Sequence, residues 1–137
     1  MDKAQLVEAF ISNFIAKHKR ERVQYELSHP KKRAKFIDNL NHRWEDFFDM
    51  RKLYPIDKKY IDSYEHVKEM LRLKDDEPCY VLSNYGSADD KILPFINAYH
   101  ECYGEGLASL IIDSTATRVF LTTELVGGHK PQFIGFA

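Results

Sequence analysis

The most distinctive chemical feature of the sequence is a cluster of cations that directly follows Pro30: Lys31, Lys32, Arg33 and Lys35. Proline is common at the first position of a helix, so we expect these side chains in the opening turns of a helix. Cations there face the positive end of the helix dipole, which typically costs about 0.3–1 kcal/mol each. An anion at that end would be stabilised by the side chains and by free backbone N–H groups. The cluster therefore predicts a site for an anionic partner.

More basic residues come shortly before this cluster, at Lys17, Lys19, Arg20 and Arg22. We assign a role in anion or partner binding to Arg20, Arg22, Lys31, Lys32, Arg33 and Lys35. Two other interpretations stay open: a solvated face, or pairing with acidic residues of the same chain such as Asp75, Asp76 or Glu77. Tyr25 is the only aromatic residue within 17–35, whereas a surface that stacks single-stranded nucleic acid interleaves several aromatic residues with its cations.

Charge is distributed unevenly along the 137 residues, although the net charge is only −1. Residues 1–35 hold nine Lys and Arg against four Asp and Glu, whereas residues 75–137 hold three against nine. Such asymmetry indicates an anionic partner for the front of the chain, an attraction between its two ends, or head-to-tail association.

Residue types that often do catalysis are present, but not in catalytic patterns. His100 and Cys102 are two positions apart, so a single helix would point them in different directions. Ser83, Asp113 and His129 lack a nucleophile motif, and we interpret Ser83 and Asp113 as turn residues at strand ends. We expect no catalytic residue, no metal and no cofactor. Cys79 and Cys102 are expected to be buried, reduced thiols.

Helical periodicity dominates the first half of the chain. Asp2 is a plausible N-cap with Gln5 three residues later, and the first helix is expected to continue to about residue 27. A second helix begins at Pro30 and carries an aromatic and aliphatic stripe that must be buried: Phe36, Ile37, Leu40, Trp44, Phe47 and Phe48. A third helix is expected over residues 60–71.

The second half instead contains short strand-like runs bounded by turn residues. We expect strands at Cys79–Ser83, Leu107–Asp113, Arg118–Leu125 and Gln132–Phe136, with a helix at Pro94–Tyr103. The predicted fold class is α+β, with three N-terminal helices packed on an antiparallel or mixed sheet of about four strands and one further helix. The N-terminal helices are expected to cover one face of this sheet.

The length of the chain fits one domain with a substantial core. We interpret residues 1–137 as a single α+β domain, with a helical part at 1–74 and a sheet-containing part at 75–137. A composition of 44% hydrophobic and 30% charged residues is typical of soluble globular proteins. The apolar run AFISNFIA is too short to cross a bilayer and lacks a cationic leader, so we expect a cytoplasmic protein without a membrane partner.

Three segments, KKRAKFIDNLNH, CYVLS and GEGLASLI, together resemble a family of small, uncharacterised bacterial proteins in which a basic helix precedes a compact strand–helix–hairpin unit. The resemblance covers about Tyr25 to Leu125. It implies this fold and a cytoplasmic bacterial origin. The family has no established activity, so the resemblance implies no function or site residues.

Three classes of function are consistent with these patterns. The first is a non-enzymatic interaction or regulatory protein, of the immunity or adaptor kind, that binds an anionic partner surface and most simply a protein. The second is a nucleic-acid or phosphate-binding protein that uses the basic start of the second helix. The third is an enzyme with a site assembled from dispersed residues. The oligomeric state does not follow from these patterns.

Overall fold

A six-stranded antiparallel sheet forms the centre of the computed structural model, which describes residues 1–102, 106–124, 128 and 131–137. The strands are β1 (Leu53–Pro55), β2 (Pro78–Ser83), β3 (Ile92–Pro94), β4 (Ser109–Asp113), β5 (Arg118–Thr122) and β6 (Gln132–Phe136). The α-helices are α1 (Lys3–Phe14), α2 (Arg20–Ser28), α3 (Pro30–His42), α4 (Tyr64–Leu71) and α5 (Phe95–Glu101). The strand order is β1-β6-β5-β4-β2-β3. The α+β class is therefore confirmed.

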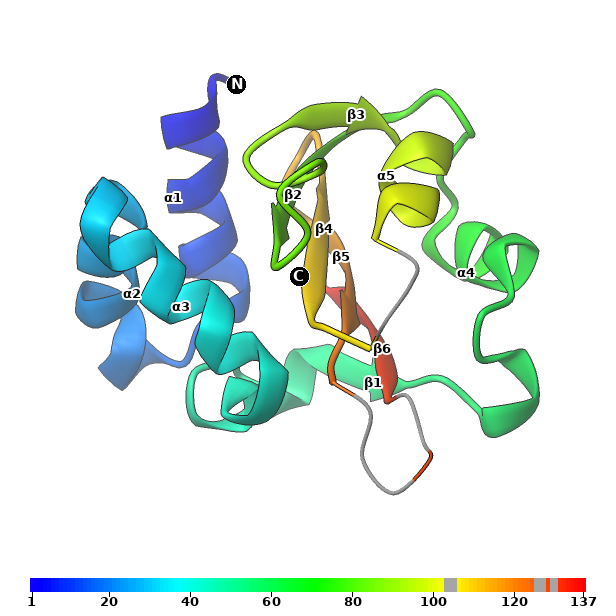
Figure 1. The fold of residues 1–137 in the computed structure, drawn as a ribbon, viewed down its shortest axis with the longest axis horizontal. Helices are drawn as coiled ribbons and strands as arrows, with labels where there is room; N and C mark the ends of the chain where they lie inside the picture. Colours follow the sequence, from blue (N-terminus) through cyan, green and yellow to red (C-terminus); the bar gives the residue numbers. More distant parts are fainter. Residues whose placement is uncertain (103–105, 125–127, 129–130) are drawn as a thin grey trace.

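Helices cover both faces of the sheet, with α1, α2 and α3 on one side and α4 and α5 on the other (Figure 1). Successive strand residues point to opposite faces, so β2 contributes Tyr80 and Leu82 to the core under α1–α3. It contributes Cys79 and Val81 to the core under α4 and α5. The expectation that the N-terminal helices cover a single face is wrong for α4, which packs on the opposite face.

The predicted first helix is divided into two. α1 begins with the expected capping box, in which Asp2 accepts from the N–H of Gln5 and the Gln5 side chain accepts from the N–H of Asp2. The helix ends at Phe14 because Ile15 becomes extended and forms a β-bridge with Phe48. A short helical turn, Lys17–Lys19, then leads into α2. The break depends on a contact between residues far apart in sequence.

Pro30 is the first residue of α3, as predicted. The helix ends at His42, earlier than the predicted stripe, and the chain continues through the helical turns Trp44–Asp46 and Met50–Lys52. All the residues of the stripe are nevertheless buried in the core under α1–α3: Phe36, Ile37, Leu40, Trp44, Phe47 and Phe48.

The main strands and the last helix fall close to their expected positions, but the sheet has more strands than expected. β1 and β3 were not predicted; each has three residues and lies at an edge of the sheet. Because β1 pairs with β6, the sheet draws on both predicted parts of the chain. Tyr103 and Leu125, the predicted ends of a helix and a strand, lie outside the described residues. Within the described ranges, no helix has both the length and the apolar character needed to cross a membrane.

Candidate functional site

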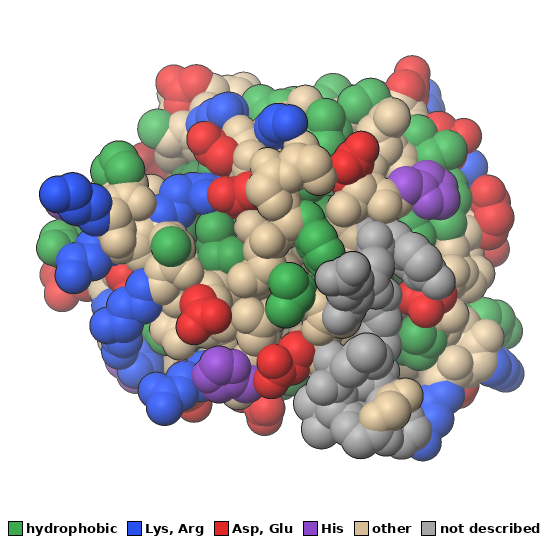
Figure 2. Space-filling view, viewed as in Figure 1, with side chains coloured by type: hydrophobic (Ala, Val, Ile, Leu, Met, Phe, Trp, Pro, Cys, Tyr) green, Lys and Arg blue, Asp and Glu red, His purple; other side chains and the backbone are tan. Residues whose placement is uncertain are grey.

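Basic residues gather on one side of the molecule, over α2 and α3 and the helical turn before α2. The two helices pack against each other, and Figure 2 shows Lys and Arg side chains concentrated on this side. We call this surface the basic face; its members are Lys17, Lys19, Arg20, Arg22, Lys31, Lys32 and Lys35. Each of them is exposed or partly exposed. Five of the six residues predicted to bind a partner lie on this face, and Arg33 is the exception.

Arg33 points inward, with a side chain that is only 17% exposed. It donates hydrogen bonds to both carboxylate oxygens of Asp89, with Nη2 at 2.9 Å from Oδ1. Nη2 also lies 3.5 Å from the hydroxyl of Tyr80 and 3.9 Å from the carboxylate of Asp90. Burial is the largest single influence on Arg33 and lowers its pKa, but the hydrogen bonds and charge interactions with Asp89 and Tyr80 together outweigh burial and raise the pKa of Arg33. The fold therefore neutralises this cation internally.

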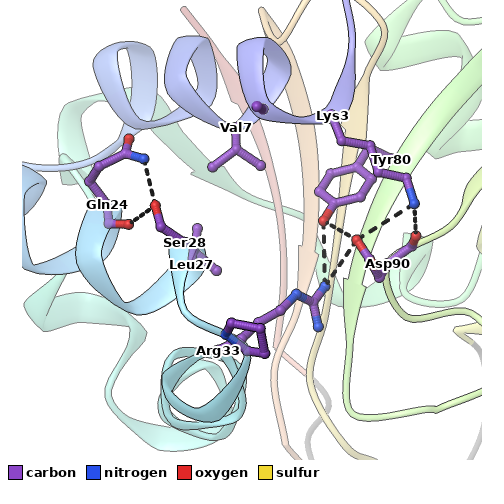
Figure 3. Close-up of a pocket in the computed structure, with 10 residues that line it drawn as sticks. Lys3, Val7, Gln24, Leu27, Ser28, Arg33, Tyr80 and Asp90 are labelled. Atoms are coloured by element: carbon purple, nitrogen blue, oxygen red, sulfur yellow. Dashed lines mark hydrogen bonds and ion pairs between the residues drawn. The ribbon is translucent and has the colours of Figure 1, made fainter.

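Asp90 extends the same network to the start of α1, as Figure 3 shows. Its carboxylate accepts a hydrogen bond of 2.7 Å from the hydroxyl of Tyr80, and its backbone oxygen accepts one of 2.7 Å from Lys3 Nζ. Burial, together with the hydrogen bond to Asp90, raises the pKa of Tyr80 to about 12. Charged and polar contacts thus join α1, α3 and the segment between β2 and β3.

The acidic partners of Arg33 were not identified from the sequence. Asp89 is 56 positions from Arg33, and the only sequence signal is a pair of adjacent carboxylates in a turn-rich stretch. Pairing of the basic segment with residues 75–77 is not what the structure shows. Asp75 instead accepts hydrogen bonds from the hydroxyl of Tyr64 at 2.5 Å and from Lys68 Nζ at 3.0 Å.

Arg20 and Arg22 belong to the basic face but also stabilise its helices. Arg20 Nε donates a 3.0 Å hydrogen bond to the backbone oxygen of Ile15, which follows α1. Arg22 lies 3.8 Å from the carboxylate of Glu26 and places its guanidinium 5.4 Å from the ring centre of Phe47. These contacts fix the positions of the two guanidinium groups and leave them partly accessible.

Lys31, Lys32 and Lys35 differ from the arginines because they have no partner in the part of the chain that the structure describes. All three are exposed, and none forms an ion pair or side-chain hydrogen bond with another residue that the structure describes. The first turn of α3 has no acidic residue and no side-chain cap, so Lys31 and Lys32 meet the helix dipole without compensation. They are therefore free to contact an anion outside the chain.

Hollows lined by residues of α2 lie beside the basic face. The network pocket, about 460 Å³, opens between Val7 of α1, Leu27 of α2 and the Arg33–Asp90 network (Figure 3). The helical pocket, about 600 Å³, lies between α1 and α2, with Ile11 and Tyr25 in its lining. Both pockets are lined by Gln24 and Ser28, which are joined by a 2.9 Å hydrogen bond.

The histidine and cysteines that were considered for catalysis do not form a catalytic arrangement. His100 is exposed beside the ring of Tyr64 whereas Cys102 is buried, so the two do not converge, as predicted. Both cysteines are free and buried, which also confirms their prediction. Burial is the largest cause that raises the pKa of the Cys102 thiol, and it likewise raises the pKa of Cys79 to about 12. Neither thiol is activated for nucleophilic chemistry.

Ser83 and Asp113 act as structural hydrogen-bonding residues at strand ends. The hydroxyl of Ser83 lies 2.7 Å from that of Ser109, and Asp113 accepts from the N–H groups of Thr117 and Arg118 across the β4–β5 turn. His129 lies outside the described residues. Among the residues that are described, no group of three or more His, Cys, Asp or Glu side chains is arranged to hold a metal ion.

Comparison of the chain with models of protein families, with curated proteins and with solved structures found no match. The resemblance to an uncharacterised bacterial family therefore stays a prediction.

Proposed function

We propose that the chain is a non-enzymatic interaction or regulatory protein whose basic face binds an anionic partner surface. The observation that carries this proposal is a set of exposed cations near the start of α3 that have no partner among the described residues: Lys31, Lys32 and Lys35. Lys31 and Lys32 lie in the first turn, where glutamate or aspartate would be more favourable. Retaining a locally unfavourable charge is typical of residues kept for binding.

Arg33 and its partners hold the start of α3, and therefore its exposed lysines, in position. The hydrogen bonds from Arg33 to Asp89 join the start of α3 to the segment between β2 and β3. They hold in place the helix that carries the lysines. A preorganised surface loses less conformational entropy when it binds, which favours affinity and specificity. Charge complementarity of this kind also accelerates association at low salt.

The proposal can be tested with defined polyanions and matched charge-reversal variants. Wild-type protein should bind polyglutamate at low salt, and binding should weaken steeply as salt is added. Replacing Lys31 and Lys32 with glutamate (Lys31→Glu/Lys32→Glu) should abolish binding. The control is Lys58→Glu/Lys59→Glu, which changes the same number of charges in a separate exposed turn and should bind like wild type.

Equal losses in the two double variants would show that binding follows net charge alone, and the proposal would be wrong. The same titrations with DNA and RNA test the nucleic-acid alternative. Tighter binding of a nucleic acid than of polyglutamate, with a steep logarithmic dependence on salt, would favour that second class of function.

A further inference from the structure

The network pocket places groups of both charges beside an apolar wall. We propose that it binds a free α-amino acid with an apolar side chain of about the size of leucine. In this arrangement the ligand's carboxylate meets Lys3 and Arg33, its ammonium meets Asp90, and its side chain lies on the apolar wall. The inference goes beyond the proposed function and does not depend on it, because neither Lys31 nor Lys32 lines this pocket.

The apolar wall comes from α1, α2 and the first residue of α3, with Ala4, Val7, Leu27 and Pro30 in the lining. Val7 and Leu27 pack against the core under α1–α3 but stay partly exposed. Figure 3 shows them across the hollow from the polar network. The volume of about 460 Å³ lies within the usual range for small-molecule sites. An aliphatic side chain in this hollow would bury apolar surface on both partners.

Lys3 and Arg33 carry more hydrogen-bond donors than the described residues accept. An ammonium group has three N–H groups, and the backbone oxygen of Asp90 accepts one of those of Lys3. A guanidinium has five, of which Asp89 accepts two and the hydroxyl of Tyr80 at most one, at 3.5 Å. Both side chains line the pocket. Their remaining donors are available to the carboxylate of a ligand.

Asp90 provides the opposite charge. Its carboxylate accepts one hydrogen bond among the described residues, from Tyr80 at 2.7 Å, whereas a carboxylate has about four acceptor positions. The side chain of Asp90 is 54% exposed, so a ligand can reach it. Its backbone N–H donates to the backbone oxygen of Val81 at 2.9 Å, and Tyr80 itself is buried. The acceptor is therefore held in place before a ligand binds, which favours affinity.

The balance of charge selects a ligand that carries both signs. Nζ of Lys3 and Nη2 of Arg33 lie 3.8 Å and 3.9 Å from the same oxygen of Asp90, and Asp89 offsets part of the positive charge of Arg33. A simple carboxylate would be repelled by Asp90, and a simple amine would be repelled by the two cations. An α-amino acid carries its ammonium, its carboxylate and its side chain on one carbon. It can therefore meet all three parts of the pocket together.

The experiment compares leucine with three analogues that each lack one part of it. Isocaproate has the same carbon skeleton without the ammonium, leucinamide lacks the negative charge, and glycine lacks the side chain. Binding is measured from amide chemical shifts in NMR titrations. Wild-type protein should bind leucine at least about tenfold more tightly than any of the three analogues. The signals that shift should include those of Val7, Leu27 and Asp90.

Variants of the charged residues assign the two ends of the ligand. Asp90→Asn keeps an acceptor for the hydroxyl of Tyr80 but removes the negative charge. It should weaken leucine binding at least about tenfold and should not weaken isocaproate binding. Lys3→Met should weaken binding of leucine and isocaproate but not of leucinamide. The matched controls, Asp38→Asn and Lys58→Met, change exposed residues outside the pocket and should bind leucine like wild type.

Several results would overturn the inference. If isocaproate or leucinamide binds as tightly as leucine, the pocket does not recognise both charges. Equal binding of glycine would show that the apolar wall makes no contribution. If Asp90→Asn folds normally by circular dichroism and still prefers leucine to isocaproate, the assignment of Asp90 is wrong. Unchanged amide signals in wild-type protein with about 10 mM leucine would refute the site as a whole. The polyglutamate titrations test the basic face separately, so either proposal can fail without the other.

Discussion

Arg33 and Lys32 are adjacent in the chain, yet their charges serve different purposes. The side chain of Arg33 is 17% exposed and shares its hydrogen bonds with Asp89, whose side chain is 22% exposed. The side chain of Lys32 is exposed and has no partner among the described residues. Removing one member of a partly buried pair leaves an uncompensated charge, whereas removing an unpaired surface cation changes little. The two residues can therefore be distinguished by stability measurements.

Arg33→Met should lower the free energy of unfolding by about 2–3 kcal/mol, because Asp89 would lose its cation in a desolvated position. Asp89→Asn keeps an acceptor for the N–H of Ser83 and serves as the second single variant. In urea unfolding, the double variant should be more stable than additivity predicts by about 1 kcal/mol or more. Lys35→Met, the unpaired control, should change stability by less than about 0.5 kcal/mol. Additive effects of Arg33→Met and Asp89→Asn would contradict the assigned ion pair.

At the scale of elements, α3 combines a buried face with an exposed basic start. Phe36, Ile37 and Leu40 anchor the helix in the core, so its stability does not depend on favourable charges in its first turn. The packing of the helix can therefore tolerate the unfavourable placement of Lys31 and Lys32. This separation of roles predicts that charge changes at the start of α3 affect binding and stability in opposite directions.

Lys32→Glu should increase the free energy of unfolding by about 0.3–1 kcal/mol, because glutamate in the first turn interacts favourably with the helix dipole. The gain should shrink as salt screens the interaction. Lys35→Glu lies beyond the first turn and three residues before Asp38, so it should give no such gain. Thermal unfolding at low and high salt measures both variants. A loss of stability in Lys32→Glu would mean that Lys32 makes an internal interaction, and its assignment to an external partner would be wrong.

Local patterns predicted the elements whose formation depends on nearby residues. The capping box at Asp2, the start of α3 at Pro30 and the last strand, Gln132–Phe136, are confirmed at their predicted positions. Elements defined by distant contacts were missed. β1 and β3 are too short to show an alternating pattern, and the end of α1 depends on the bridge from Ile15 to Phe48. Periodicity carries no information about such pairings.

The same limit applies to the candidate site. Exposed lysines could be predicted from the composition and spacing of the basic cluster, and Lys31, Lys32 and Lys35 are indeed exposed. The internal role of Arg33 could not be predicted, because Asp89 is 56 positions away in sequence. The helical pocket was missed for a related reason. It forms only because α1 ends at Phe14 and α2 packs beside it.

At the scale of the whole molecule, the sheet joins the two cores through closely packed strands. Gly135 of β6 lies where three other elements meet: α1, β1 and β5. A Cβ atom there would lie 2.6 Å from Cγ2 of Val119, 2.9 Å from Cδ2 of Leu53 and 3.1 Å from Cε1 of Phe14. Such distances leave no room for a methyl group unless these side chains, or the elements that carry them, shift. The position therefore tests whether helices and sheet unfold together.

Gly135→Ala should lower the free energy of unfolding by about 1–3 kcal/mol through overpacking. Because α1, β1 and β5 all contact this position, we expect the thermal midpoints measured by far-ultraviolet circular dichroism and by fluorescence of Trp44 to fall together. Gly86→Ala is the control, since a Cβ there would meet nothing within 4 Å, and it should be close to neutral. Midpoints that separate in Gly135→Ala would show that α1–α3 unfold independently of the sheet, in conflict with the prediction of a single domain.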